Sequence, residues 1–369
     1  MKKRWNRIKT FFSKPYNVLL ILFVIVLGFL VVIPLISIVK DTFIVHSSEK
    51  ARVHQAVGTF TTYHWNRLFR SDFSKSLLWD PLRNSLVTSV WSCVVSILIG
   101  GSFAWLVSRS DMRWKKLLTK LFIFPYIMPS WTLALAWKNF FKNVEITGSN
   151  GIFYSLTHIQ VPTWFAYGEF PIIMVTGMHY APFAYILIGG IFKNMDANLE
   201  EAATILDTPR WKIMSRVTLP MIKPAILSTI LLVFGSAMGS YPVPHYLGLT
   251  TLSTKYISLN SKYTGEASIL AIIMMVFGVL ILSLNQMSLK SRKNYTTVTG
   301  KSGQLTKINL GKVGKYVIGI IFIVVTFFTS IWPILLFALE TFLPNPGDYS
   351  FLYTGDLANQ RKMLKRRKN

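Results

Sequence analysis

The sequence predicts an all-α integral membrane protein with about seven transmembrane helices. Three observations lead to this prediction: 51% of the 369 residues are hydrophobic, only 15% are charged, and the mean hydropathy is +0.42. A soluble domain has about 25% charged residues. The hydrophobic residues are also gathered into long blocks, and a helix needs ~20 of them in succession to cross ~30 Å of hydrocarbon.

Seven blocks reach that length, and each is a predicted span. The third contains Lys120 and Pro125, so its boundaries are less sharp than those of the first and the last two. The first block follows the basic segment MKKRWNRIK, but its length of about 22 residues exceeds the apolar region of a signal peptide. We therefore expect a retained helix there. The spans are Val18–Val39, Asn84–Val107, Leu117–Trp137, Phe170–Phe192, Pro224–Leu247, Ser268–Met287 and Tyr316–Leu339.

Loop charges predict a cytoplasmic N-terminus. With this orientation the inside segments carry 22 lysine and arginine residues in 84 positions, against 11 in 98 for the outside segments. Basic residues favour the cytoplasmic side of a membrane. Topology therefore accounts for most of the net charge of +25, and nucleic acid is not an expected partner. The inside segments are 1–16, 108–116, 193–223 and 288–315, and the outside segments are 40–83, 138–169 and 246–267.

No catalytic site, metal site or cofactor is expected. The six histidines are scattered, and Cys93 is the only cysteine. Gly300-Lys301-Ser302 resembles the end of a phosphate-binding loop, but position 295, where that loop requires glycine, is Tyr. The sequence therefore predicts a protein that is not an enzyme.

The predicted cytoplasmic loop between the fourth and fifth spans begins as a short helix. Asn198 can cap it, and Glu200 and Glu201 lie in its first turn, where the helix dipole favours acidic side chains. Ala202 and Ala203 follow and give this helix a small, smooth face that another surface can approach closely.

A second short helix is expected directly after the first. Asp207 stands where the first helix would end, and aspartate tolerates the left-handed backbone conformation. Thr208 and Pro209 would start the second helix as N-cap and first helical residue. Pro220 would end it before the next span.

This loop resembles the EAA signature of permease subunits of binding-protein-dependent ABC importers, E-A-A-x3-G-x9-I-x-L-P. Every spacing is kept, but aspartate replaces the glycine and valine the isoleucine. The resemblance implies a type I importer permease with six core helices, whose loop 193–223 docks on a cytoplasmic ATPase dimer. ATP would be hydrolysed by that partner. The coupling residues are Glu200, Glu201, Ala202, Ala203, Asp207, Val217, Leu219 and Pro220.

Three further segments resemble the ferric-iron and polyamine branch of this family. They are Ala104-Trp105-Leu106-Val107, Phe124-Pro125-x3-Pro129 and Pro182-Phe183-x-Tyr185. Ferric iron is favoured as the substrate because that branch often fuses two permease halves in one chain. A polyamine, a phosphonate or another small anion stays open as the substrate. A secondary transporter and a non-functional truncated permease are the alternative functions.

An internal repeat supports such a fusion. Val32–Phe43 recurs as Ile331–Phe342, with proline, an acidic residue, threonine and phenylalanine in register at an offset of 299. The expected organisation is a basic N-terminus (1–16), a permease domain (17–290), a basic linker (291–315) and the first helix of a second, truncated half (316–369). Six basic residues in 361–369 conflict with an outside tail, so a shifted or interrupted reading frame is expected from about residue 357.

Polar side chains within the spans are candidates for the translocation pathway, because polar groups at membrane depth usually face a bundle interior or a cavity. They are His179, Tyr180, Ser240, Tyr241 and His245, and hydrogen bonds between helices would explain them equally well. The resemblance also implies an extracytoplasmic substrate-binding protein that docks on the outer loops, and a second permease half or a homodimer partner. The lipid bilayer of a bacterial cell membrane is the expected location.

Overall fold

The structure is a computed structural model that describes residue 11 and residues 13–195, 202–291 and 308–343. The basic N-terminus up to residue 10, the linker 292–307 and the tail 344–369 lie outside the described residues. Those described form helices and two isolated β-bridges, without a β-strand, which confirms the all-α prediction. Six helices are long and apolar enough to cross a membrane, or seven if one bent pair counts as a span.

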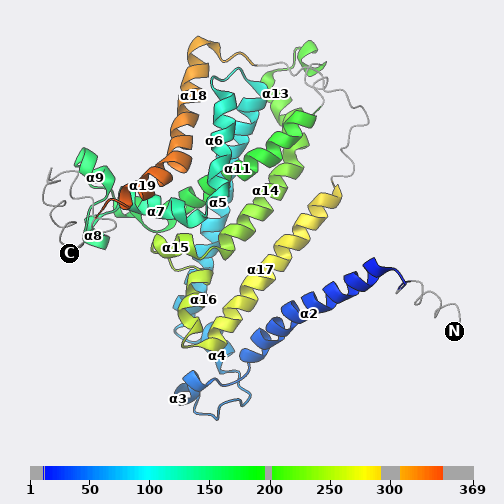
Figure 1. Cartoon of the computed structure of the whole chain (residues 1–369), viewed down its shortest axis with the longest axis vertical. Helices are drawn as coiled ribbons and strands as arrows, with labels where there is room; N and C mark the ends of the chain where they lie inside the picture. The colour runs from blue at the N-terminus through cyan, green and yellow to red at the C-terminus, as the bar shows by residue number, and fades with distance from the viewer. Residues whose placement is uncertain (1–10, 12, 196–201, 292–307, 344–369) are drawn as a thin grey trace. The chain divides into compact units, whose positions relative to one another are not determined.

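The chain divides into two compact units, whose helices are labelled in Figure 1. The first comprises Met1–Trp79 with Lys255–Met275, and the second comprises Asp80–Thr254 with Val276–Asn369. In the first unit, α2 (Pro15–Asp41) is followed by α3 (Lys50–Val53) and α4 (Tyr63–Arg70). The helices α16 (Leu252–Asn260) and α17 (Thr264–Ser291) each have residues in both units.

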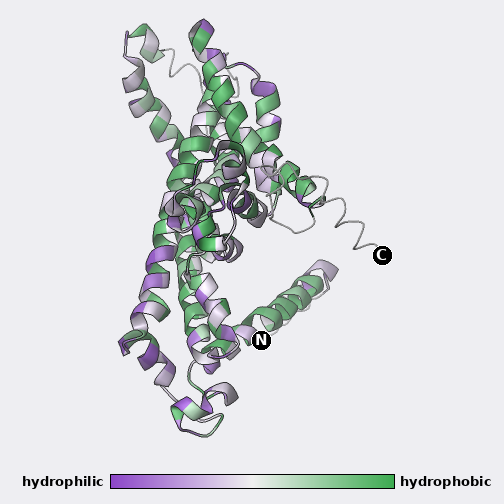
Figure 2. Cartoon of the chain, turned by 90° about the vertical axis from the view of Figure 1, so that its left-hand side faces the viewer, coloured by the Kyte–Doolittle hydropathy of each residue, from purple (hydrophilic) through white to green (hydrophobic). Residues whose placement is uncertain are grey.

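The helix α2 is the most apolar candidate span in the described part of the chain, and most of its apolar side chains are exposed. Pro15 lies in its first turn, where a missing backbone N–H costs nothing. Its most hydrophobic window of 18 residues has a mean hydropathy of 3.4 and is 0% buried. Figure 2 shows α2 mostly in the green of hydrophobic residues. Such a helix requires lipid or another protein around it.

The third predicted span is wrong as a single helix. Leu117–Trp137 divides into α6 (Lys115–Ile127) and α7 (Ser130–Phe141), which meet at an angle of 99°. The break lies at Met128 and Pro129, because a residue that precedes proline is forced into an extended conformation, and Met128 has ψ 147°. Pro125, by contrast, lies inside α6.

The fifth predicted span is also too long. The helix α14 (Leu219–Gly239) ends eight residues before the predicted boundary at Leu247, and α15 (Pro242–Tyr246) follows as a separate short helix. The two prolines of α15 explain the break, because neither can donate a backbone hydrogen bond to the preceding turn. The other helices of the second unit are α5 (Asp80–Arg109), α8 (Val144–Thr147), α9 (Ile152–Thr157), α10 (Thr163–Ala166), α11 (Glu169–Asn194), α13 (Arg210–Ile213), α18 (Gly311–Thr326) and α19 (Trp332–Glu340).

The helices α5 and α11 approach each other closely through small residues. A Cβ atom added at Gly100 on α5 would lie 2.1 Å from the carbonyl oxygen of Ala181 on α11. A Cβ atom at Gly177 on α11 would lie 2.5 Å from a methyl carbon of Val95 on α5. In membrane bundles, where lipid competes with side chains for apolar contact, small residues of this kind allow tight helix packing.

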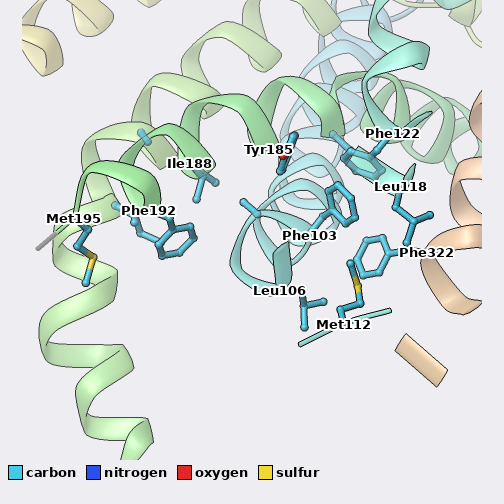
Figure 3. Close-up of a cluster of buried hydrophobic side chains, with 14 residues drawn as sticks. Phe103, Leu106, Met112, Leu118, Phe122, Tyr185, Ile188, Phe192, Met195 and Phe322 are labelled. Carbon is cyan, nitrogen blue, oxygen red and sulfur yellow. The ribbon is translucent and has the colours of Figure 1, made fainter. Parts of the chain in front are cut away.

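An aromatic cluster joins four helices of the second unit (Figure 3). The ring centroid of Phe103 on α5 lies 4.2 Å from that of Phe122 on α6, 5.0 Å from that of Tyr185 on α11 and 4.8 Å from that of Phe322 on α18. Phe103 and Phe122 are almost wholly buried. The seventh predicted span therefore packs on the same core as the second, third and fourth.

Candidate functional site

The predicted coupling loop contains a short helical turn at residues 202–205 that ends in a defined cap. Asp207 has φ 51°, in the left-handed region. The backbone N–H of Asp207 donates to the carbonyl of Thr204, and that of Thr208 donates to the carbonyl of Ala203, both at 3.0 Å. These two bonds form a Schellman cap, whose left-handed position glycine usually occupies. The left-handed conformation predicted for Asp207 is confirmed.

The second helix of the loop differs from the prediction in two respects. It begins at Arg210 rather than at Pro209, and the carbonyl of Pro209 accepts from the N–H groups of Lys212 and Ile213. Pro220 does not end it. Instead α13 continues through a π-helical segment, Met214–Thr218, into α14, with proline in the first turn of α14. The wider π turn accommodates a residue that lacks a backbone N–H.

The loop exposes three large hydrophobic side chains that sequence reasoning missed. Ile205, Leu206 and Trp211 are 85%, 79% and 77% exposed. Isolated exposed hydrophobic residues are common, but three within the seven positions 205–211 of this loop are an unusual concentration. Their presence in a loop that otherwise holds many polar residues is the signal that could have identified them.

The structure places the predicted coupling residues in different environments. Glu200 and Glu201 lie outside the described residues. Ala202 and Asp207 are exposed and Ala203 is half-buried, so this turn presents its small residues outward. Val217 packs against the aromatic core, which links the loop to the bundle. Two further residues, Leu219 and Pro220, are exposed at the start of α14.

Two of the predicted pathway residues lie in a group of rings between α6 and α11. His179 is buried, and its ring lies 4.7 Å from that of Tyr180 in an edge-to-face arrangement. The ring centroid of Tyr126 on α6 lies 6.2 Å from that of His179 and 6.4 Å from that of Tyr180. Sequence reasoning missed Tyr126, because its helix bends away from the predicted straight span.

The other three pathway candidates lie together at the break after α14. The carbonyl of Ser240 accepts a hydrogen bond of 2.6 Å from the hydroxyl of Ser253. The rings of Tyr241 and His245 stack with their centroids 5.0 Å apart and an angle of 20° between their planes. The five candidates thus form two groups within the second unit.

Comparisons with known proteins agree with this architecture. The profile of the family described as "Binding-protein-dependent transport system inner membrane component" matches residues 6–294. A ferric transport system permease protein, FbpB, from Actinobacillus pleuropneumoniae is 25% identical over 60% of this chain and 32% of its own. The inner membrane ABC transporter permease protein YcjO of Escherichia coli (strain K12) is 26% identical over 59% of this chain and 79% of its own. The chain thus spans about a third of the length of the ferric permease.

A solved structure shares the fold. It is a bacterial ABC transporter involved in the import of the acidic polysaccharide alginate, and its matched chain superimposes with a TM-score of 0.57 at 18% identity. The match covers 80% of this chain and 100% of that chain. The similarity supports the helical fold.

Proposed function

Because the chain belongs to the family of binding-protein-dependent transport system inner membrane components, we propose that it is the membrane-spanning permease of an ABC importer. Its several apolar helices place it in the membrane, and the loop charges favour a cytoplasmic N-terminus and a cytoplasmic coupling loop. A separate ATPase dimer would hydrolyse ATP. A substrate-binding protein outside the membrane would deliver the substrate to outer loops 40–83 and 138–169.

The capped turn of the coupling loop carries this proposal. Its geometry supports docking in a groove of the ATPase, because the Schellman cap fixes the turn while Ile205, Leu206 and Trp211 stay exposed. Apolar anchors with fixed backbones lose little conformational entropy on binding. Movement of the ATPase would then reach the bundle through Val217, which packs on the aromatic core, and alternate the access of the pathway.

Association with the ATPase tests this role. Replacing Ile205 with Ser should weaken co-purification of the ATPase and reduce uptake, while the amount of inserted permease stays unchanged. Ile159→Ser is the matched control for co-purification of the ATPase, because Ile159 is also an exposed isoleucine, at 61%, but belongs to a predicted outer loop. Equal co-purification of the ATPase by both variants would contradict the proposed docking surface.

Ferric iron is the substrate we propose. The support is the branch-like segments around α5, α6 and α11 together with the ferric transport relative, whereas the solved relative imports alginate. The competing substrates are polyamines on the one hand, and phosphonates or other small anions on the other. Cells that express the complete importer should take up radiolabelled ferric iron, and excess spermidine or phosphonate should leave that uptake unchanged. Inhibition of iron uptake by either compound would indicate that this compound, and not ferric iron, is the substrate.

A second permease half is the partner that we propose for α2. The repeat segment Ile331–Phe342, which contains α19, lies in a stretch that packs on this half. Directly before it, the hydroxyl of Ser330 donates to the carbonyl of Leu121 on α6 at 2.9 Å. Within the repeat segment, the ring centroid of Trp332 lies 4.9 Å from that of Phe140 on α7. By the internal repeat, α2 would pack in the same way on a second half, either fused or a homodimer partner. Disulfide trapping between cysteines introduced along α2 and the partner half would test this arrangement.

A further inference from the structure

Three ionisable side chains from distant parts of the sequence meet inside the first unit. They are Glu49 before α3, His64 in the first turn of α4 and Glu266 in the first turn of α17. Their side chains are 0%, 0% and 1% exposed. Burying charged groups is costly unless opposite charges are paired. The protonation state of this cluster therefore decides whether it stabilises the unit.

The imidazole ring of His64 lies between the two carboxylates. Its Nε2 is 3.3 Å from Oε2 of Glu49 and 3.2 Å from the carbonyl oxygen of Ile44. Its Nδ1 is 3.3 Å from Oε2 of Glu266. An ionised carboxylate and a carbonyl can only accept hydrogen bonds. Both ring nitrogens thus face negatively polarised oxygen atoms.

Neither neutral tautomer of His64 suits these surroundings. A neutral imidazole carries a hydrogen on one nitrogen and a lone pair on the other. With the hydrogen on Nε2, the lone pair of Nδ1 would face Glu266, and with the hydrogen on Nδ1, the lone pair of Nε2 would face Glu49. Such repulsion is strong in a buried site of low dielectric constant. Only the imidazolium, with an N–H group on both nitrogens, presents positive charge to each carboxylate.

The outer oxygens of both carboxylates have partners that favour the ionised form. The guanidinium of Arg67 donates to Oε1 of Glu266 at 3.2 Å, and that of Arg52 approaches the same oxygen at 3.7 Å. Arg52 also lies 4.0 Å from Oε1 of Glu49, which accepts from the backbone N–H of Gly265 at 3.3 Å. These contacts use the Oε1 atoms, so the Oε2 atoms are left to His64.

Two further titratable side chains lie near the ring of His64. The ring centroid of His46 is 6.4 Å away, and Nε2 of His46 lies 3.9 Å from Oδ1 of Asp41. The ring of Tyr63 meets that of His64 edge to face, with the centroids 5.8 Å apart. Both rings are more distant than the carboxylates, and His46 has an acidic partner of its own. Glu49 and Glu266 therefore dominate the charge state of His64.

The first turn of α17 lies tightly against the ring. A Cβ atom added at Gly265 would lie 2.4 Å from the carbons Cγ and Cδ2 of His64. Little room is left for the ring to turn toward other partners while α4 and α17 stay in contact. A change in the charge of His64 must therefore act on this contact.

We propose that protonated His64 is a pH-sensitive clasp, which fastens the segment before α3 and the start of α4 to the first turn of α17. The charged ring bridges Glu49 and Glu266. When the ring loses its proton, a lone pair faces a buried carboxylate and the contact opens. All three residues belong to the predicted outside segments 40–83 and 246–267, so the pH outside the cell would set the state of the clasp.

The clasp closes at low pH and opens at high pH. Burial lowers the pKa of His64, but the contacts with Glu266 and Glu49 outweigh that effect and raise the pKa. The stabilisation is fully present below the ordinary histidine pKa of about 6.5 and is lost as the pH rises through the raised pKa. Each unit of difference between the pKa values of the closed and open states changes their equilibrium about tenfold.

Nuclear magnetic resonance of the purified full chain in detergent tests the charge of His64. The protein, with an affinity tag free of histidine, is labelled with ¹³C at the Cε1 atoms of its six histidines. The signal of His64 disappears in His64→Gln, and that of the exposed His54 disappears in His54→Gln. If His64→Gln does not fold, substitution of the other histidines in turn assigns the signal by elimination.

The signal of His64 should titrate at a higher pH than that of His54. Glu266→Gln removes the charge that faces Nδ1, so the titration of His64 should move to lower pH while that of His54 stays unchanged. A titration of His64 below that of His54 would overturn the proposal, and so would a titration that Glu266→Gln leaves unmoved.

Amide hydrogen exchange tests whether this charge fastens the two segments. After correction for the intrinsic pH dependence of exchange, protection of α4 and of the first turn of α17 should fall between about pH 6 and about pH 9. The fall should be about tenfold for each unit by which the measured pKa of His64 exceeds about 6.5. His54→Gln should keep this fall, whereas His64→Gln should show none. An equal fall in His64→Gln, or protection that rises with pH, would overturn the clasp.

Discussion

Replacing Gly100 with alanine should destabilise the bundle at the crossing of α5 and α11. The added methyl carbon would lie 2.1 Å from the carbonyl oxygen of Ala181 and 2.7 Å from the Cβ of Ala184, whereas real contacts of this kind stay above 3.0 Å. The two backbones must therefore move apart along a tightly packed crossing. Overpacking of this kind costs about 1–3 kcal/mol. The better helix propensity of alanine returns about 1 kcal/mol, so a net loss of up to about 2 kcal/mol is expected.

The neighbouring residue provides a matched control. A methyl group at Gly101 would meet only flexible side-chain atoms, 3.4 Å away on Ile188 and 3.9 Å away on Ile97. Gly101→Ala should therefore leave the free energy of unfolding unchanged or raise it by up to about 1 kcal/mol. Both variants can be unfolded by sodium dodecyl sulfate in mixed micelles and followed by tryptophan fluorescence. If Gly100→Ala is as stable as Gly101→Ala, the close approach of the two helices is wrong.

Three further predictions address the core, the coupling turn and the topology. Phe322→Ala should lower the free energy of unfolding by about 3–5 kcal/mol, because it opens a cavity in the aromatic cluster, and the same micelle titration would detect this loss. Asp207→Gly should slow amide hydrogen exchange in the coupling turn by removing a left-handed strain of up to about 1 kcal/mol, and should preserve uptake. In a Cys93→Ser background, cysteines at Ser48 and Ser215 should react with impermeant reagents from outside and inside, respectively, and the reverse pattern would overturn the orientation.

Hydropathy predicted the spans well because burial in lipid requires long apolar blocks, whatever their packing. The predicted block Phe170–Phe192, for example, lies within α11. Hydropathy reports how apolar a segment is and not the direction of its helix axis, so it did not predict the bend between α6 and α7. Both Pro125 and Pro129 stand in the predicted span, yet only Pro129 lies at the break. Local sequence does not decide which proline a helix accommodates, because the packing of neighbouring helices can replace the lost hydrogen bond.

The coupling loop was predictable to the extent that its structure is local. The left-handed conformation at Asp207 follows from residue type and spacing, because the cap needs only the preceding turn. The π-helical segment before Pro220 is not local, since its extra residue per turn depends on where α14 packs against the bundle. The exposure of Ile205 and Leu206 likewise became clear only once the fold showed which residues the bundle buries.

The buried ion-pair cluster of Glu49, His64 and Glu266 in the first unit shows where spacing rules fail and a different rule succeeds. Short motifs are recognised when their residues share a helix or a short loop, but Glu266 lies 202 positions after His64. A lone carboxylate at the start of a long apolar helix nevertheless demands a partner, because an ionisable group at such a position is costly without one. Glu266 falls two residues before the predicted sixth span, Ser268–Met287, and inside the helix that begins at Thr264. Extending that span by one turn would have placed an acid within it and required a basic partner elsewhere in the chain, which the structure provides as Arg52, His64 and Arg67.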